Sequence, residues 1–366
     1  MKTKTENRYQ NNKERQKISL WNKKLSHFYR NKFALTAGVI VLFLYILTIF
    51  APFFAPYSSN KNFKEKFFHP PTKIHFSDQN GLRAPFIYET ELKEGWAEYE
   101  INKDKKHNLK FFHRGEKYKL LGILESDIHL IGVEADVPIF ILGSDNYGRD
   151  LLSRIIYGGR VSLFIGFFAI FITTVIGLIV GGISGYYGGF IDSIIMRSAE
   201  VIMSIPSFYL LLALAAVLPL DLSSSFRFFL IISILAFQGW ASMARVIRGM
   251  VLSVKNEEYI LAAKSIGADD KRIILKHILP STATYVIIRA TVAIPGYIIM
   301  ESGLSFIGLG IQEPSASWGN MLSSAQNITK ISDFPWLLLP GFFIFITVLS
   351  YNILGDGLRD AFDPKY

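Results

Sequence analysis

The sequence predicts an all-α polytopic membrane protein with six transmembrane helices, and three observations lead to this fold class. Half of the 366 residues are hydrophobic, although the chain also carries 39 basic and 30 acidic side chains. The apolar residues are gathered in long blocks almost free of charge, whereas a soluble domain distributes them with short helical or strand periods. Basic residues are concentrated beside some blocks and scarce beside others. Lipid is therefore the expected surrounding of these blocks.

Six stretches supply the roughly 20 apolar residues that a helix needs to cross the hydrocarbon core. They cover residues 33–55, 161–185, 200–219, 228–244, 284–308 and 335–355. We expect each stretch to be one span, separated from the next by a polar connection.

The N-terminal residues 1–33 are predicted to be a cytoplasmic basic tail with an interfacial elbow helix. They carry ten Lys or Arg against two acidic residues, a flank that membrane topology explains more simply than nucleic-acid binding does. Residues 18–32 mix aromatic and basic side chains at helical spacing, which favours a helix in the interface plane; a disordered tail is the alternative. No small-residue cleavage site follows the long apolar block, so residues 34–57 are expected to stay as the first transmembrane helix.

The distribution of basic residues predicts the orientation of the chain in the cytoplasmic membrane. The loop 245–285 holds seven Lys or Arg, whereas residues 310–334 hold only Lys330. Because cytoplasmic loops carry the excess of basic residues, loop 245–285 and both termini are expected in the cytoplasm.

Residues 58–142 form the region that looks soluble. They contain thirteen basic and thirteen acidic residues, several Pro and Gly, and short runs of alternating character. We expect a small β-rich extracytoplasmic insertion here. Two roles are equally open for it, a docking surface for another protein and a passive lid.

Four glycines at every fourth position are predicted to pack one helix closely against another, because small residues let helices approach in lipid. They are Gly177, Gly181, Gly185 and Gly189. A phosphate-binding loop is excluded, since no Gly-Lys-Ser/Thr follows. The chain has no cysteine, and its seven histidines lie outside metal-ligand spacings, so we expect neither a metal site nor a catalytic site.

Several ionisable or helix-breaking residues stand out at the predicted spans. Arg289 and Glu301 interrupt the fifth span, and a charge at membrane depth is costly unless it is paired or hydrated. We expect Arg289 to snorkel to the interface, and Glu301 to be hydrogen-bonded within the protein near the outer mouth, with direct contact to cargo as the alternative. Pro206 is expected to kink the third span, as a gate or as a packing bend.

Four charged residues precede the second span, namely Asp145, Arg149, Asp150 and Arg154. They are expected to position this helix at the interface, and contact with another protein is the alternative.

The loop from Glu257 to Pro280 has the pattern of a helix, a tight turn and a second helix. Gly267 is suited to end the first helix, and Asp269 or Asp270 to cap the second. A short apolar face at helical spacing is formed by Tyr259, Ala262, Ala263 and Ile266. A helix of this kind fits a groove on a soluble partner, although an ordinary amphipathic linker has the same pattern.

This loop resembles the EAA signature of permease subunits in bacterial ABC importers. The resemblance is carried by Glu258, Ala262, Ala263, Gly267, Ile278, Leu279 and Pro280. In that family the loop is the coupling helix that docks onto the ATP-hydrolysing subunit. The resemblance therefore implies that this chain is not an enzyme and binds no cofactor, since ATP and Mg belong to partner subunits.

Four further segments are similar to motifs of the second permease of dipeptide and oligopeptide transporters. They are LGSDNYGRDLLSRIIYGGRVSL from Leu142, MSIPS from Met203, ESGLSFIGLGIQEPSASWGNML from Glu301 and NILGDGLRDAFDP from Asn352. The likeness covers residues 20–57 and 142 to the end, and leaves out the insertion, which is longer than in simpler members. It implies a type I ABC importer permease fold, with residues 143–366 as the core permease domain.

The resemblance implies a peptide permease that works with a homologous second permease, two ABC ATPase subunits and an extracytoplasmic binding protein. Nickel chelate, glutathione or an oligosaccharide are alternative cargoes of the same branch. An ion-driven secondary transporter and a membrane-anchored interaction protein are rivals from other classes. The first rival would be expected to show repeated halves, and no convincing internal repeat is visible.

Overall fold

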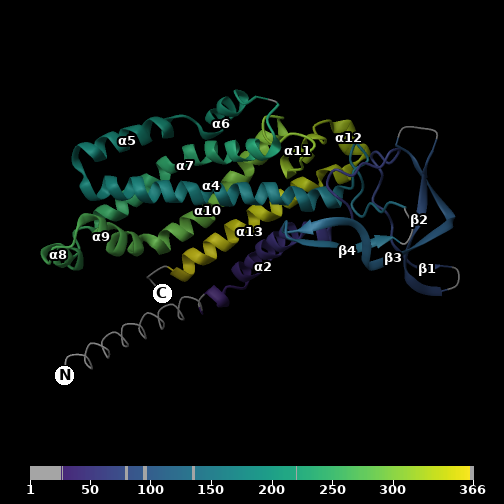
Figure 1. The fold of residues 1–366 in the computed structure, drawn as a ribbon, viewed down its shortest axis with the longest axis horizontal. Helices are drawn as coiled ribbons and strands as arrows, with labels where there is room; N and C mark the ends of the chain where they lie inside the picture. The colour runs from purple at the N-terminus through teal and green to yellow at the C-terminus, as the bar shows by residue number, and fades with distance from the viewer. Residues whose placement is uncertain are drawn as a thin grey trace, which may run out of the picture.

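The computed structural model is an elongated helical bundle with a small β-sheet at one end (Figure 1). It describes residue 26 and residues 28–78, 81–93, 97–133, 137–219 and 221–362. Most of the expected N-terminal tail and elbow helix falls outside these residues. Within the described chain, five helices are long and apolar enough to cross a membrane: Lys32–Ile49, Leu151–Tyr187, Ser224–Val254, Asp270–Phe306 and Pro335–Phe362.

These spans correspond to labelled elements of Figure 1. The first three are α2 (Lys32–Ile49), α4 (Leu151–Tyr187) and α7 (Ser224–Val254), and the last two contain α10 (Leu279–Phe306) and α13 (Leu339–Phe362). Several helices run beyond the predicted boundaries, as α4 does by starting ten residues before residue 161. Hydropathy marks only the part of a helix that lies in hydrocarbon, so polar helical ends escape it.

The third expected span, residues 200–219, is a broken pair of helices rather than one helix. α5 (Gly189–Ser204) and α6 (Ser207–Ala216) are bent by 84° relative to each other. Pro206 is the N-cap of α6, and Ile205 before it is extended, because a residue that precedes proline is pushed out of the helical region. Counted as one broken span, the pair brings the described total to six.

Three of the four aligned glycines form the close contact between α4 and α7. A Cβ atom at Gly177 would lie 2.4 Å from the Met243 side chain, and one at Gly181 would lie 2.5 Å from the carbonyl oxygen of Ala244. Gly185 meets Val251 in the same way. Such backbone proximity is how helices gain van der Waals contact in lipid, where no hydrophobic force pairs them.

Gly189 departs from this pattern and corrects the expectation of a four-glycine stripe. α4 ends at Tyr187, and both Gly188 and Gly189 have positive φ values, 67° and 57°, in the turn to α5. A Cβ at Gly189 would meet nothing within 4 Å. This glycine therefore serves the turn and not the helix contact.

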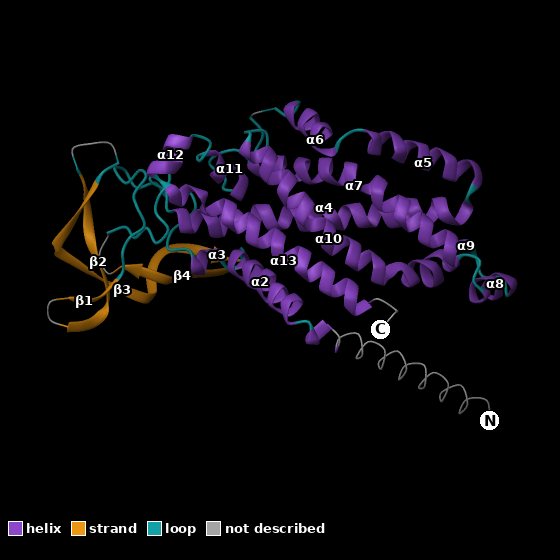
Figure 2. Cartoon of the chain, turned by 180° about the vertical axis from the view of Figure 1, so that it is seen from behind, coloured by secondary structure: helices purple, strands orange, loops and turns teal. Residues whose placement is uncertain are grey.

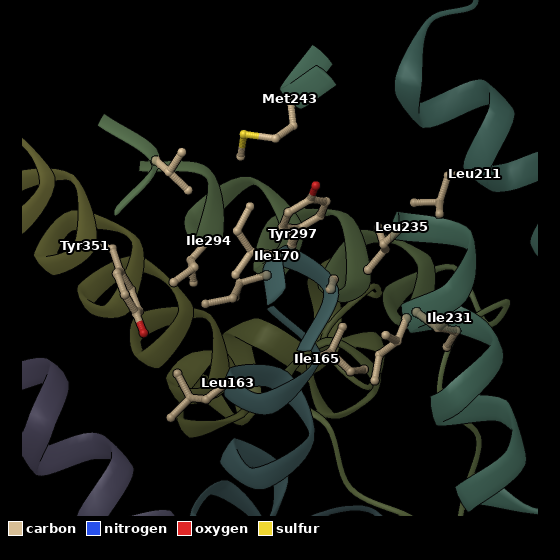
Figure 3. Close-up of a cluster of buried hydrophobic side chains, with 14 of the residues drawn as sticks. Leu163, Ile165, Ile170, Leu211, Ile231, Leu235, Met243, Ile294, Tyr297 and Tyr351 are labelled. Atoms are coloured by element: carbon tan, nitrogen blue, oxygen red, sulfur yellow. The ribbon is translucent and has the colours of Figure 1, made fainter. Parts of the chain in front are cut away.

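The bundle core is a cluster of large apolar side chains from the spans and from α6 (Figure 3). Figure 3 labels Leu163, Ile165, Ile170, Leu211, Ile231, Leu235, Met243, Ile294, Tyr297 and Tyr351. Most of these side chains are aliphatic and interdigitate. Dense packing of this kind fixes the relative positions of α4, α7 and α10.

The connection between α2 and α4 contains the β-rich insertion. After the short helix α3 (Ala51–Phe54) come β1 (His75–Asp78), β2 (Gly81–Leu92), β3 (Tyr99–Leu120) and β4 (Leu124–Val133). They form one antiparallel sheet in the order β1-β2-β3-β4, drawn in orange at one end of Figure 2. Ile87 is buried against Val133 and Ile139 and attaches the sheet to the following loop.

The segment between α10 and α13 folds at the same end of the bundle as the sheet. It contains α11 (Trp318–Ser323), α12 (Ile328–Asp333) and a 3-10 turn (Pro335–Leu338). α11 begins with a capping box in which Ser317 and Asn320 satisfy each other's backbone donors. Trp318 is fully buried, and its indole N–H donates to the carbonyl oxygen of Ile155, 2.9 Å away.

Candidate functional site

The loop after α7 projects from the end of the bundle opposite the sheet (Figure 1). It consists of α8 (Glu258–Ser265), a tight turn and α9 (Asp270–Ile273). Gly267 has φ +84°, its N–H donates to the carbonyl oxygen of Lys264, and the Ala268 N–H donates to that of Ala263. This pair of bonds is a Schellman motif, which needs a left-handed residue at the position of Gly267.

The side chains of α8 divide between an inner and an outer side. Ile260 and Ala263 are buried, whereas Tyr259 and Ile266 are 48% and 87% exposed. Of the expected apolar face, only Ala263 is therefore turned inward. The exposed part presents large apolar groups without cover from the described residues, as a surface for a partner does.

The second half of the loop continues directly into α10. Asp270 to Phe306 forms one continuous helix, interrupted by a π-helical turn over Ile274–Ile278. Pro280 lies in the first turn of α10 and lacks the N–H that would bond to the residue four positions back, so the widened turn accommodates it. Ile278 is buried and Leu279 half-buried at this joint, and a push on α8 or α9 would reach α10 through it.

The prediction that an aspartate side chain caps α9 was wrong. Asp269 occupies the N-cap, but its side chain makes no capping hydrogen bond. Asp270 instead accepts a hydrogen bond from the hydroxyl of Tyr186, 2.5 Å away at the end of α4. This bond ties the loop to a second span.

A cavity of 280 Å³ lies beside the break between α5 and α6. It is lined by α5, α6, α7 and α10, with Ile205 and Ser207 from either side of Pro206. Gln238 and Ser242 of α7 and Tyr297 of α10 add polar groups to a wall that is otherwise mostly apolar. Few convergent polar groups on an apolar wall are typical of a site for a small ligand.

Glu301 lies elsewhere and is fully buried. Its carboxylate accepts hydrogen bonds from Ser162 of α4 at 3.1 Å and from Ser305 at 2.7 Å. The two serine oxygens in turn accept the backbone N–H groups of Trp318 and Ile311. Glu301 therefore joins α4, α10 and α11 from within, which fits the expected internal hydrogen bonding and leaves no exposed surface for cargo.

The charged residues before α4 form an ion-pair cluster with a residue that the sequence did not single out. Arg149 and Arg154 both contact Glu313, with shortest distances of 2.6 Å and 3.0 Å, and Asp145 contacts both arginines. The cluster fastens the segment before α4 to the loop after α10. Glu313 was missed because a single acidic loop residue carries no local signal.

Asp150, the residue before α4, caps that helix by accepting the Ser153 backbone N–H at 2.7 Å. Burial raises its pKa to about 7, and the hydrogen bonds from Ser153 oppose this shift. Its Oδ1 atom has no hydrogen-bond partner among the described residues.

Two arginines within the spans are placed differently. Arg289 is exposed and lines a second cavity of 630 Å³ together with Arg359 of α13. Arg227 of α7 is buried and donates to the carbonyl oxygens of Pro219 and Gly310. The sequence prediction began this span at residue 228 and so missed Arg227. Among the described residues, no group of three or more His, Cys, Asp or Glu side chains is arranged to hold a metal ion.

Comparison with known proteins places these features in a family. Residues 173–366 match the family described as the binding-protein-dependent transport system inner membrane component, and residues 19–71 match the N-terminal TM domain of oligopeptide transport permease C. The match over 173–366 contains the α8–α9 loop and the cavity beside Pro206.

Three curated relatives are similar over long stretches. The oligopeptide transport system permease protein of Bacillus subtilis is 32% identical and covers 95% of this chain and 90% of its own. The dipeptide transport system permease protein of the same organism is 46% identical over 61% of this chain and 68% of its own, and an oligopeptide permease of Haemophilus influenzae is 44% identical over 61% and 70%. The chain therefore belongs to the family of binding-protein-dependent transport system inner membrane components.

Proposed function

We propose that this chain is a permease subunit of an ATP-driven importer that carries dipeptides or oligopeptides across the cytoplasmic membrane. The names of the relatives support this cargo, since all three are described as dipeptide or oligopeptide permeases. The chain itself hydrolyses no ATP in this proposal. Free energy enters through partner subunits that bind ATP with different affinity in two conformational states.

The assembly contains four kinds of partner: a homologous second permease in a heterodimer, two ABC ATPase subunits, an extracytoplasmic peptide-binding protein and the surrounding lipid. Nucleic acid has no part in it. Loop 245–285 and both termini face the cytoplasm, and the insertion 58–142 faces the other side. The positive-inside distribution of Lys and Arg supports this orientation.

The domains follow the same division. Residues 1–33 are the cytoplasmic tail and elbow helix, 34–57 the first transmembrane helix, 58–142 the insertion and 143–366 the core permease. The sheet between residues 75 and 133 supports an insertion in this part of the chain, and the family match over residues 173–366 lies within the proposed core permease.

The single observation that carries the mechanism is the exposed apolar side of α8 on a rigid connection to α10. An ATPase subunit binds Tyr259 and Ile266 in its groove, with Glu258, Ala262, Ala263 and Gly267 completing the docking surface. Movement of the ATPase pair then displaces Ile278, Leu279 and Pro280 and with them α10. Because α10 also lines the cavity beside Pro206, the same movement opens or closes that cavity.

Cargo passes this cavity on its way across the membrane. The amide of Gln238 offers a donor and an acceptor that match a peptide group, and the break at Pro206 lets α5 and α6 move separately. Gly177, Gly181 and Gly185 keep α4 and α7 together as the fixed wall. Glu301 holds the opposite end of α10 in place and does not contact cargo.

The test is ATP hydrolysis by the purified complex in lipid vesicles, with and without peptide-loaded binding protein. We expect stimulation by the loaded binding protein in the wild type and its loss in Gly267→Val, since a β-branched residue does not tolerate the positive φ. Co-purification of all subunits shows that the variant complex stays assembled. Normal stimulation in the variant would contradict the docking role of this loop.

A further inference from the structure

The hairpin of β3 and β4 ends in an apolar tip, Leu120–Leu124, that no described residue covers. Leu121, Ile123 and Leu124 are 60%, 82% and 62% exposed. Large aliphatic side chains side by side on a turn are unfavourable in water, where turns are normally polar. We therefore expect this tip to be surrounded by something other than water.

The backbone of the turn makes the leucine more unusual. Leu121 and Gly122 have φ values of 51° and 75°, and the Ile123 N–H donates to the carbonyl oxygen of Leu120 at 3.1 Å. The loop between the paired residues Leu120 and Leu124 has three residues, and its two successive positive φ values favour glycine or asparagine, because leucine does not tolerate this region. The chain thus accepts a strained leucine at the most prominent position of the hairpin, and backbone strain of this kind is typical of functional sites.

The tip lies beside the membrane-spanning helices. Leu121 and Gly122 line a cavity of 460 Å³ together with Ile49 of α2, Phe164 and Phe168 of α4 and Phe228 of α7. The outer side of α4 continues this surface with the exposed rings of Phe167 and Phe171. The apolar tip is therefore continuous with a face of the bundle that lipid must cover.

The depth of the tip follows from α2. This helix has 18 residues, about 27 Å at 1.5 Å per residue, which nearly matches a hydrocarbon core of about 30 Å. Ile49 is its last residue, at the side of the insertion, so Ile49 marks the edge of the hydrocarbon. Leu121 shares a cavity with Ile49 and with Phe168, which lies further along α4.

Basic groups stand at the rim of the same cavity. Lys119 pairs with Glu125 across the hairpin at 3.6 Å, and Arg160 donates to the carbonyl oxygens of Thr48 and Ile49. Lysine and arginine beside an apolar insertion suit the level of the lipid head groups, where their stems pack on apolar surface and their charges meet phosphate.

We propose that the hairpin tip Leu120–Leu124 enters the lipid leaflet on the side of the insertion, and that acyl chains fill the cavity between the tip and α4. The occupant is membrane lipid. The sheet is then held against the bundle at the membrane surface by an anchor of its own. This inference rests on the chain crossing a membrane and not on the identity of its cargo.

The chain has no cysteine, so single cysteines allow nitroxide labels to be placed without a background. The full chain carries a label at Ile123→Cys or, as a control in the same sheet, at the exposed Lys103→Cys, in phosphatidylcholine and phosphatidylglycerol vesicles. We expect the label at 123 to respond more strongly to oxygen, which partitions into lipid, than to a water-soluble nickel chelate. The label at 103 should show the reverse.

Two outcomes would overturn the proposal. A label at 123 that the chelate reaches as readily as the label at 103 would place the tip in water, and one shielded from both reagents would place it against protein. A second variant adds Leu121→Asn to the label at 123. Asparagine relieves the backbone strain of the turn but removes an apolar side chain from the tip, so access of the chelate to the label should rise at least threefold. Unchanged access would show that Leu121 does not contribute to the anchor.

Discussion

The two ends of the bundle are built in opposite ways. At the sheet end, Arg154, Glu301 and Trp318 are buried, and each has a hydrogen-bond partner from a segment far away in the sequence. At the other end, Tyr259 in α8 and Ile266 at its C-cap are exposed, and α8 is held by the buried side chain of Ile260, by its own turn and by the joint to α10. These buried polar groups of the first end have partners within the chain, whereas the exposed apolar groups beside α8 form the surface where we propose that a partner docks.

This difference predicts where substitutions cost stability and where they cost function. Removing a buried partner leaves an unsatisfied group behind, which destabilises the fold. Removing an exposed apolar group costs the isolated chain little, because that group has no contacts to lose.

The largest loss of stability is expected for Arg154→Ala at the sheet end. The Arg154 side chain is 1% exposed and pairs with Glu313 and Asp145, so its loss removes one of the two arginine partners of each carboxylate and leaves a buried space behind. Breaking a buried pair typically costs about 3–5 kcal/mol, and solvent at Glu313 places the expected cost at the lower limit. Denaturant unfolding in detergent measures it.

The matched control is Arg197→Ala in α5. Arg197 also pairs with a glutamate, Glu200 at 3.1 Å, but its side chain is 84% exposed. An exposed pair contributes roughly 0–1 kcal/mol. Equal losses in the two variants would show that the cluster at the sheet end has no special role in stability.

A pH effect of nearly the same size is expected from His69 in the insertion. Its ring faces the Thr90 hydroxyl at 2.7 Å and the Pro70 carbonyl oxygen at 2.6 Å, and burial lowers its pKa to about 4. The unfolded chain therefore binds the proton more tightly, and the stabilising contribution is full above pH 6.5 and is lost as the pH falls towards 4. At 1.36 kcal/mol per pH unit, the loss is about 3 kcal/mol.

His69→Gln isolates this contribution. The raised pKa of Asp150 acts in the opposite sense over an overlapping pH range, so the difference between variant and wild type is the informative quantity. Unfolding temperatures from tryptophan fluorescence at pH 7.5, 6, 5 and 4 should show the wild type losing its advantage as the pH falls. A constant difference would mean that His69 keeps an ordinary pKa.

A smaller loss, about 1–3 kcal/mol, is expected when Gly181 becomes leucine. The added Cβ would meet the backbone of α7 at Ala244, which cannot move without separating the two helices. Gly249→Leu in α7 is the control, because a Cβ there meets nothing within 4 Å and leucine favours a helix. Size-exclusion chromatography and unfolding midpoints compare the two variants. Equal results for Gly181→Leu and Gly249→Leu would contradict a close contact between α4 and α7 at Gly181.

The spans and the α8–α9 loop could be predicted because their signals are local. Apolar runs mark lipid-facing helices, and a glycine between two amphipathic stretches marks the turn at Gly267. The kink of the third span at Pro206 was predicted, whereas the start of the span at Gly189 was not, because apolar composition does not show where a helix begins or in which direction the chain runs. Its proline gave the position of the break but not an angle of 84°.

The buried polar contacts could not be predicted, since their partners are distant in sequence. In the sequence, Arg227 looks like the end of a span. In the structure it donates to the carbonyl oxygen of Gly310, 83 residues away. Glu313 likewise acquires its role only when folding places it beside Arg149 and Arg154. The strained Leu121 leaves no sequence signal, because only its φ value distinguishes it from any leucine in a strand.

The most direct test compares two isoleucines of nearly equal exposure at opposite ends of the molecule, Ile266 at the C-cap of α8 at 87% and Ile328 in α12 at 83%. Each is changed to serine in the complex with its ATPase subunits, and ATP hydrolysis in lipid is measured without binding protein. Neither substitution should change the free energy of unfolding by more than about 0.5 kcal/mol. We predict that Ile266→Ser lowers hydrolysis and ATPase co-purification at least tenfold while Ile328→Ser changes neither; equal activity in the two variants would contradict docking at α8.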